Sequence, residues 1–130
     1  MGLSEGKVEA AIAVTDMGRA VEFYEGKLGL TSNTGEEPDG GRTYQCGGGT
    51  SIHVFPSPNA RASGATVAGW IVDDIEGTVE ELIAGGVSFE QYSDGPFKTD
   101  EKGLAQMGDY RGAWLKDPDG NVLGIGNGEM

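Results

Sequence analysis

The sequence has one cysteine, one histidine, and only 9 lysine and arginine residues against 21 aspartate and glutamate residues. A single cysteine, Cys46, excludes an internal disulfide and any metal site built from a cysteine cluster. The formal net charge of -12 repels phosphate backbones and anionic lipids. We therefore expect no nucleic-acid partner and no role at a membrane surface.

Long apolar runs are also missing. No stretch approaches the roughly 20 residues that a membrane-spanning helix needs. The N-terminal MGLSEGK carries no apolar segment of the kind found in secretory signals. With 130 residues, 37% of them hydrophobic, the chain has the size of one domain or of two very small halves that share a core. We expect a cytoplasmic protein.

The sequence does contain an internal repeat. The stretches VEAAIAVTDMGRAVEFYEGKLGL and TVAGWIVDDIEGTVEELIAGGV each begin with alternating apolar residues, the pattern of a half-buried strand, and continue with an apolar stripe at helical spacing. Asp16 and Asp74 are placed as N-caps of the two helices. Superposing residues 14–17 on residues 72–75 aligns the rest of both helices. The two halves are therefore expected to share one fold.

Three short strands are expected after each helix. They cover residues 30–36, 42–46, 50–55, 87–92, 110–116 and 121–126. Asp117-Pro118-Asp119-Gly120 is a hairpin turn between the last two. Each half then reads β-α-β-β-β, which predicts an α+β fold with module one at about residues 6–56 and module two at about residues 66–127. Residues 57–65, rich in Pro, Ser, Ala and Gly, are the linker between them.

The motifs VTDMGRAVEFYEGKLGL, IVDDIEGTVEELIAGGV and RGAWLKDPDGN run along nearly the whole chain. Together they resemble the vicinal oxygen chelate superfamily, which includes glyoxalase I, bleomycin resistance proteins and extradiol dioxygenases. The resemblance implies a single domain of two βαβββ modules, whose curled mixed sheets surround a cleft and whose helices lie on the outer faces. It also implies a homodimer.

In metal-dependent members of that superfamily, the ligands come from the first and last strand of each module. Matching the motifs puts these positions at Glu9 and His53 in module one and at Val67 and Gly124 in module two. A catalytic zinc site keeps three protein ligands and an open position. Since only Glu9 and His53 can bind a metal, we expect neither a catalytic metal nor another cofactor; any metal that did bind would use these two residues.

Two functions remain open for such a protein. Glu9 and His53, paired across neighbouring strands, form either a general-base pair in a glyoxalase-like or dioxygenase-like lyase or isomerase, or a polar pair that only satisfies itself. An acidic cleft with an incomplete metal site also resembles that of the drug-sequestering members of the superfamily. The second function is therefore the binding of a small organic molecule, such as a drug or a metabolite, without conversion.

Several side chains are candidates for the wall of the cleft. The aromatic candidates, each with a core position as its alternative, are Tyr44, Phe55, Tyr92, Phe97 and Trp114. Val67 and Gly124 complete the wall. Lys98 lies in the polar segment 92–110, which is either a lid or a solvated hairpin connection; in a lid it would be placed to meet a carboxylate on a ligand. Trp70 has the parity of the helix-facing strand residues, so we expect it beneath the helix.

Overall fold

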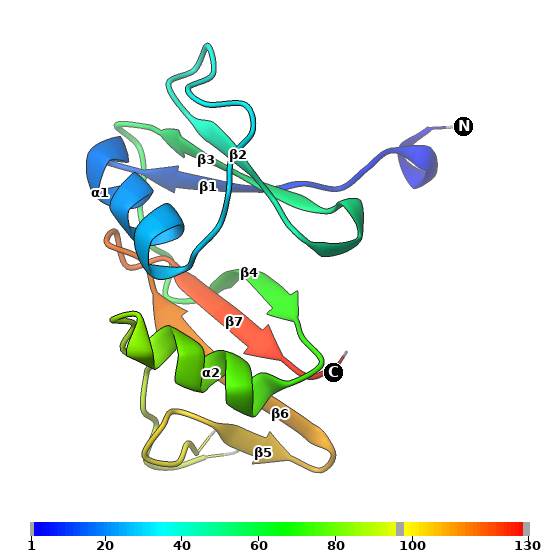
Figure 1. The fold of residues 1–130 in the computed structure, drawn as a ribbon, viewed down its shortest axis with the longest axis vertical. Helices are drawn as coiled ribbons and strands as arrows, with labels where there is room; N and C mark the ends of the chain where they lie inside the picture. The colour runs from blue at the N-terminus through cyan, green and yellow to red at the C-terminus, as the bar shows by residue number, and fades with distance from the viewer. Residues whose placement is uncertain (1, 96–97, 129–130) are drawn as a thin grey trace. The chain divides into compact units, whose positions relative to one another are not determined.

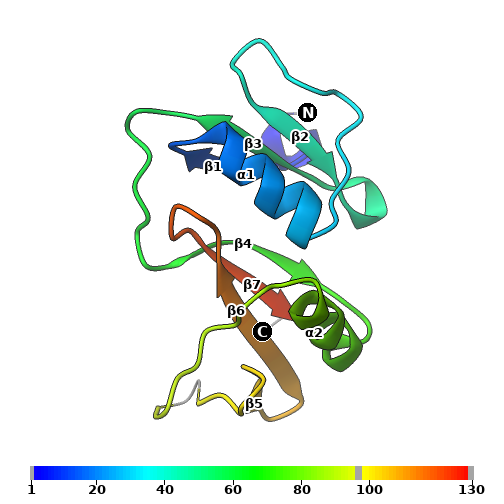
Figure 2. The ribbon, with the colours of Figure 1, turned by 60° about the vertical axis from the view of Figure 1, so that its left-hand side comes forward.

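The computed structural model describes residues 2–95 and 98–128. It divides the chain into two compact units, unit 1 (Met1–Arg61) and unit 2 (Ala62–Met130), and the division falls inside the predicted linker (Figure 1, Figure 2). Each unit contains a small mixed sheet and few helices. The fold class is therefore α+β, as the repeat predicted. In the described part of the chain, no helix is long and apolar enough to cross a membrane.

Unit 1 contains a three-stranded sheet of order β1-β3-β2. β1 (Ala10–Val14) runs parallel to β3 (Ser51–Pro56), and β2 (Arg42–Gln45) runs antiparallel to β3. Alternation along β1 and β3 buries every second side chain, because successive side chains point to opposite faces of a sheet. One face of this sheet therefore carries the core of unit 1, and the other carries His53 and its neighbours.

The main helix of unit 1, α1 (Met17–Val21), begins after Asp16. The Asp16 carboxylate accepts a hydrogen bond from the backbone N–H of Arg19 at 3.2 Å, which confirms the predicted N-cap. α1 continues as the π-helical segment η2 (Glu22–Lys27). Two single-turn 3-10 helices complete the unit, η1 (Leu3–Glu5) and η3 (Gly47–Gly49).

Unit 2 contains a four-stranded sheet of order β4-β7-β6-β5. β4 (Thr66–Ile71) runs parallel to β7 (Val122–Gly126), which pairs antiparallel with β6 (Tyr110–Lys116). β5 (Ala105–Met107) pairs antiparallel with β6 at the edge. The bounds of β6 and β7 agree with the predicted strands, and the hairpin turn between them is where the Asp-Pro-Asp-Gly motif placed it.

α2 (Ile75–Ala84) covers one face of the sheet of unit 2 (Figure 1). Asp74 is its N-cap and accepts a hydrogen bond from the backbone N–H of Gly77 at 3.0 Å, again as predicted. The helix buries Ile75 and Val79. The core of unit 2 is therefore the layer between α2 and the apolar side chains of β6 and β7.

Two of the six predicted strands do not form. In place of a strand at 30–36, the structure has a single bridge between Thr31 and Gln45, and in place of one at 87–92 it has a single bridge between Phe89 and Leu115. The first segment contains SNTGE, whose hydroxyl side chains bond to nearby backbone and favour a loop. The short strand β5 was not predicted, since AQM is too short and too polar to show alternation.

Candidate functional site

The face of the unit 2 sheet opposite α2 is shaped by strand register. Trp114 of β6 lies opposite Gly124 of β7, and Gly124 lies opposite Gly69 of β4. These three residues therefore share one face, whereas their sequence neighbours Leu115 and Leu123 are buried on the other. Trp70 pairs with Ile125, which has the parity of Leu123, so strand parity places it opposite Trp114, although Trp70 also lines a hollow that Trp114 borders.

The indole of Trp114 lies beside Gly124, where an added methyl group would meet the ring at ordinary van der Waals distance. A Cβ built at Gly124 would stand 3.6 Å from both Cδ1 and Nε1 of Trp114, so the ring lies over bare backbone. Tyr92 reaches the same ring from the segment after α2, with ring centroids 5.9 Å apart and planes inclined by 65°. This edge-on arrangement is one that aromatic pairs prefer. Two aromatic rings thus form a corner on this face.

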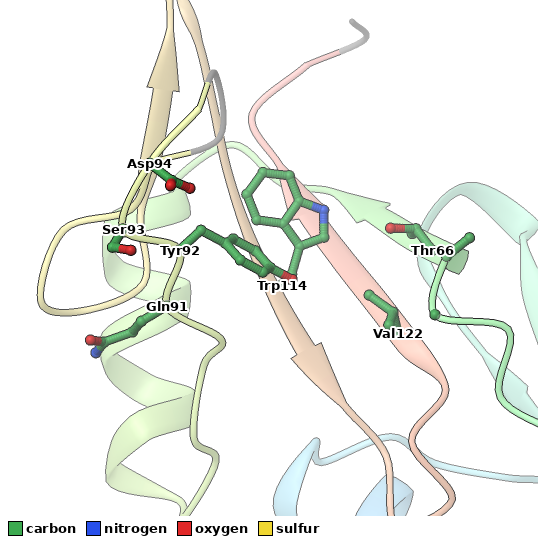
Figure 3. A pocket seen from close by; sticks show the side chains of 9 residues that line it. Thr66, Gln91, Tyr92, Ser93, Asp94, Trp114 and Val122 are labelled. Carbon is green, nitrogen blue, oxygen red and sulfur yellow. The ribbon is translucent and has the colours of Figure 1, made fainter.

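The corner opens into a cavity of about 640 Å³, which we call the Tyr92 pocket. Figure 3 shows the indole of Trp114 in the middle of the wall, with Tyr92 on one side and Thr66 and Val122 on the other. The lining residues that the structure describes are Gly64, Ala65, Thr66, Gln91, Tyr92, Ser93, Asp94, Trp114 and Val122. Its volume lies within the roughly 300–1,000 Å³ of small-molecule sites. Among these described lining residues, Asp94 is the one charged side chain.

The other unit 2 residues that were predicted to contact a ligand, and that the structure describes, do not line the Tyr92 pocket. Lys98 lines a separate hollow of about 290 Å³ on the same segment, together with Tyr92. Val67 is 43% exposed at a β-bulge in β4 and does not line the Tyr92 pocket. Gly124 lines a neighbouring hollow. Phe97 lies outside the described residues.

Sequence reasoning missed part of the wall of the Tyr92 pocket. Gln91, Ser93 and Asp94 flank Tyr92 in the chain, and Thr66 begins β4. Their only signal was their position beside a candidate aromatic or at the start of a predicted strand. Which of them reach the cavity depends on how the chain turns after α2, and the sequence pattern does not specify that turn.

In unit 1, His53 lies on the sheet face opposite the core. Its Nε2 lies 2.7 Å from Oδ2 of Asp39, and its Nδ1 lies 3.0 Å from the Thr43 hydroxyl and 3.8 Å from Oε1 of Glu37. The imidazole also stacks on Phe55, with centroids 5.7 Å apart and planes 13° from parallel. With 16% of its side chain exposed, His53 ties loop 37–41 to the sheet.

The two carboxyl groups beside His53, those of Asp39 and Glu37, have lowered pKa values. The hydrogen bond from His53 is the main cause that holds the pKa of Asp39 below its ordinary value, and the backbone N–H of Gly41 adds to it at 2.8 Å. Hydrogen bonding from Thr43 is the main cause of the lowered pKa of Glu37. Since an ionised Asp39 can only accept, Nε2 of His53 carries the donated proton.

The expected pair between Glu9 and His53 does not form. The parallel register sets His53 opposite Ala11, so Glu9 lies further along the strand and its carboxylate accepts a hydrogen bond from the Ser51 hydroxyl at 2.8 Å. Asp39 takes the place beside His53 instead. A carboxylate on one ring nitrogen can orient a histidine base, so a substrate proton would have to be taken by Nδ1, beside which the Thr43 hydroxyl lies in this structure.

The donor set does not fit the metal centre that the superfamily resemblance raises. The two candidate ligands of module one, Glu9 and His53, are directed to Ser51 and Asp39. Across the described residues, no group of three or more His, Cys, Asp or Glu side chains is arranged to hold a metal ion. A zinc site requires at least three such ligands. The described residues therefore do not provide the ligands of a zinc site.

Tyr44 and Phe55 differ in their surroundings. Tyr44 has no exposed surface, and its ring lies 6.0 Å from that of Tyr24. Its hydroxyl donates to Oε2 of Glu25 at 3.0 Å. The expectation that Tyr44 lines a wall is therefore corrected: its parity on β2 turns it into the core of unit 1. Phe55 is half-buried beside His53, on the opposite face.

Comparisons with known proteins bear on the whole chain. Residues 8–125 match the family model of the Glyoxalase/Bleomycin resistance protein/Dioxygenase superfamily. No sequence of a curated protein matches the chain significantly.

Solved structures resemble the chain over nearly its full length. UcmS2 superposes with a TM-score of 0.72 at 19% identity, covering 94% of this chain and 97% of that one. TnmS3, an antibiotic binding protein from Streptomyces sp. CB03234, gives 0.68 at 24% identity, covering 96% of each chain. A glyoxalase / bleomycin resistance protein from Catenulispora acidiphila gives 0.63 at 22% identity, covering 92% and 96%. With its repeat, its two mixed sheets and the match over residues 8–125, the chain belongs to the glyoxalase/bleomycin resistance protein/dioxygenase superfamily.

Proposed function

We propose that the chain binds a small, flat aromatic molecule in the Tyr92 pocket of unit 2. The observation that carries the proposal is the corner formed by Tyr92 and Trp114 at the wall of a cavity of about 640 Å³. A flat ligand can stack on one ring while the edge of the other closes its side. Aromatic contacts of this kind add roughly 0.5–1.5 kcal/mol beyond the burial of apolar surface.

Two further observations support binding. The lining combines apolar surface with a few polar groups, from Gln91, Ser93 and Asp94, which is the usual composition of a small-molecule site. TnmS3, which has a similar fold, is described as an antibiotic binding protein. We extend the proposal to the sequestration of a drug or a metabolite. A cleft between the modules, a homodimer and a cytoplasmic location stay predictions.

The alternative, a lyase or isomerase that uses Glu9 and His53, has less support. A general base needs a free nitrogen near its substrate, and His53 has Asp39 and Thr43 at its two nitrogens. Glu9 is engaged by Ser51. Binding without conversion is therefore the function that we propose, with no metal and no cofactor in it.

The proposal can be tested through Trp114 itself. The chain has two tryptophans, so Trp70→Phe leaves Trp114 as the only indole. In this background we expect a panel of uncharged chromones, coumarins, flavones and anthraquinones to include compounds that quench the fluorescence of Trp114. We expect Tyr92→Ala to weaken that binding about tenfold, since one aromatic contact is lost. Recovery of the compound unchanged after incubation separates binding from conversion.

Ile83→Ala is the matched control, because Ile83 is 42% exposed on α2, close to the 38% of Tyr92, and does not line the pocket. It should leave the affinity unchanged. Absence of binding across the panel would overturn the proposal. An equal loss of affinity in Tyr92→Ala and Ile83→Ala would do the same, because it would place the binding elsewhere.

A further inference from the structure

A second hollow lies beside the Tyr92 pocket on the same face of the unit 2 sheet. It has a volume of about 350 Å³, and we call it the Tyr110 hollow. Thr66 and Trp114 line both cavities. The other described lining residues are Gly69, Trp70, Ile71, Tyr110, Gly124, Gly126 and Gly128. The side chain of Trp114 is therefore a shared wall, with the Tyr92 pocket and the Tyr110 hollow next to each other.

Close packing of aromatic side chains on glycine backbone shapes the Tyr110 hollow. A Cβ built at Gly126 would collide with the Tyr110 hydroxyl, and one at Gly112 would stand 3.0 Å from the same ring. Tyr110 therefore lies against the sheet over two glycines, as Trp114 does over Gly124. Between the two rings, the paired residues Gly69 and Gly124 contribute only backbone to the floor.

The edge of the Tyr110 hollow is apolar and exposed. Ile71, the last residue of β4, has 65% of its surface exposed although it borders a cavity lined by aromatic rings. A ligand segment in the hollow would cover part of this side chain and the ring of Tyr110. Burial of that surface favours binding by roughly 25 cal/mol for each Å² removed from water.

We propose that the ligand of this protein is an elongated molecule with two linked flat segments, one in the Tyr92 pocket and the other in the Tyr110 hollow, with Trp114 contacting both. The inference rests on the proposed function and specifies the class of ligand: two aromatic units joined by a single bond or a short link. A ligand with only one such unit fills the Tyr92 pocket and leaves the Tyr110 hollow to water.

A matched pair of probes tests the two-segment ligand. Chromone has one flat unit, and flavone is chromone with a phenyl ring attached through a single bond. Affinities for both are measured by isothermal titration calorimetry on the parent chain, because Trp70 also lines the Tyr110 hollow and its replacement would alter the second site. We expect flavone to bind about tenfold more tightly than chromone, since the phenyl ring adds an aromatic contact and buried area.

Two isoleucines supply the variant and its control. Ile71→Gln changes the edge of the Tyr110 hollow, and Ile83→Gln makes the same change at an exposed position of α2 that borders neither cavity. We expect Ile71→Gln to remove most of the preference for flavone and to leave chromone binding unchanged. Ile83→Gln should alter neither affinity. Both side chains are exposed, so both variants should fold, which circular dichroism checks.

The outcomes separate this inference from the proposed function. The two-segment ligand is overturned if chromone and flavone bind with equal affinity, or if the preference for flavone survives Ile71→Gln. In either case the proposed function stands as long as Tyr92→Ala still weakens the binding of both probes. If neither probe binds the parent chain, or if Tyr92→Ala has no effect on either, the proposed function itself fails.

Discussion

Replacement of Tyr44 tests whether this side chain belongs to the core of unit 1 or to a ligand-binding wall. Its ring is completely buried and stacks on Tyr24, with planes 19° apart. Removing a buried aromatic side chain of this size typically costs about 3–5 kcal/mol, because contacts are lost and a cavity remains. We therefore expect Tyr44→Ala to lower the free energy of unfolding by that amount.

Tyr44→Phe isolates the hydroxyl group. The hydroxyl donates to Oε2 of Glu25, and that same oxygen accepts from Nη1 of Arg42 at 3.0 Å. Glu25 thus keeps a partner in the variant, so no buried charge is left unpaired. We expect a loss of about 1.5–2 kcal/mol, in the lower part of the roughly 1.5–3 kcal/mol range for one hydrogen bond to a charged group.

Urea unfolding followed by circular dichroism measures both losses, and flavone titration measures the site. The core interpretation predicts that Tyr44→Phe binds flavone with unchanged affinity, since its ring remains in place. A loss of less than about 1 kcal/mol in Tyr44→Ala, well under the range for buried aromatics, would refute the reasoning. So would a tenfold loss of affinity in Tyr44→Phe at unchanged stability, because it would make Tyr44 a ligand contact.

The pH dependence of the same pair supplies a second check. Burial, followed by the hydrogen bond to Glu25, raises the pKa of Tyr44 above its ordinary value of 10.0. The unfolded phenol therefore ionises first, and the stability contributed by the neutral hydroxyl is present below about pH 10 and lost as pH rises toward the folded pKa. The stability difference between the parent chain and Tyr44→Phe should be constant up to about pH 9 and shrink by about pH 11. A constant difference would contradict the burial of the hydroxyl.

Three further predictions concern other parts of the chain. In His53→Ala the pKa of Asp39 should rise toward its ordinary value of 3.8, because the hydrogen bond from the ring is the main cause of its lowering; a carboxyl titration by NMR that shows no change would contradict this. Gly103→Ala should cost about 2 kcal/mol or more in urea unfolding, since Gly103 has φ +92° and its new Cβ would stand 2.6 Å from Cβ of Phe89; a loss under about 0.5 kcal/mol would argue against that contact. Asp74→Ala, which removes the N-cap of α2, should cost about 1 kcal/mol by the same measurement, and an unchanged midpoint would mean that the cap is not formed in solution.

The parts of the fold that were predicted correctly depend on local signals. The N-caps Asp16 and Asp74 and the strand 110–116 follow from cap chemistry and alternation, which involve only neighbours in the chain. The strands expected at 30–36 and 87–92 were wrong, because each segment makes a single bridge in the structure in place of a ladder of strand pairs. Edge segments of this kind carry too little apolar pattern to be distinguished from loops.

The candidate site was predictable in part. Tyr92 and Trp114 were expected on the wall of a cleft between the modules; in the structure they line one pocket of unit 2, and their contact with a ligand stays a prediction. Tyr44 had the same aromatic signal and is a core residue, since composition alone does not determine which face of β2 is covered. The partner of His53 was also wrong, because Asp39 comes from a loop whose path no periodic pattern describes.

The sequence by itself determined the repeat, the α+β class and the superfamily, because a strand, a capped helix and a glycine-rich turn are each specified by residues close together in the chain. Only the tertiary structure decided that Trp114 lies over Gly124, that Tyr92 meets it edge-on, and that His53 is tied to Asp39. These contacts join residues far apart in sequence. They depend on strand register and on loop paths, and a shift of one residue in register would turn each strand side chain to the opposite face of its sheet.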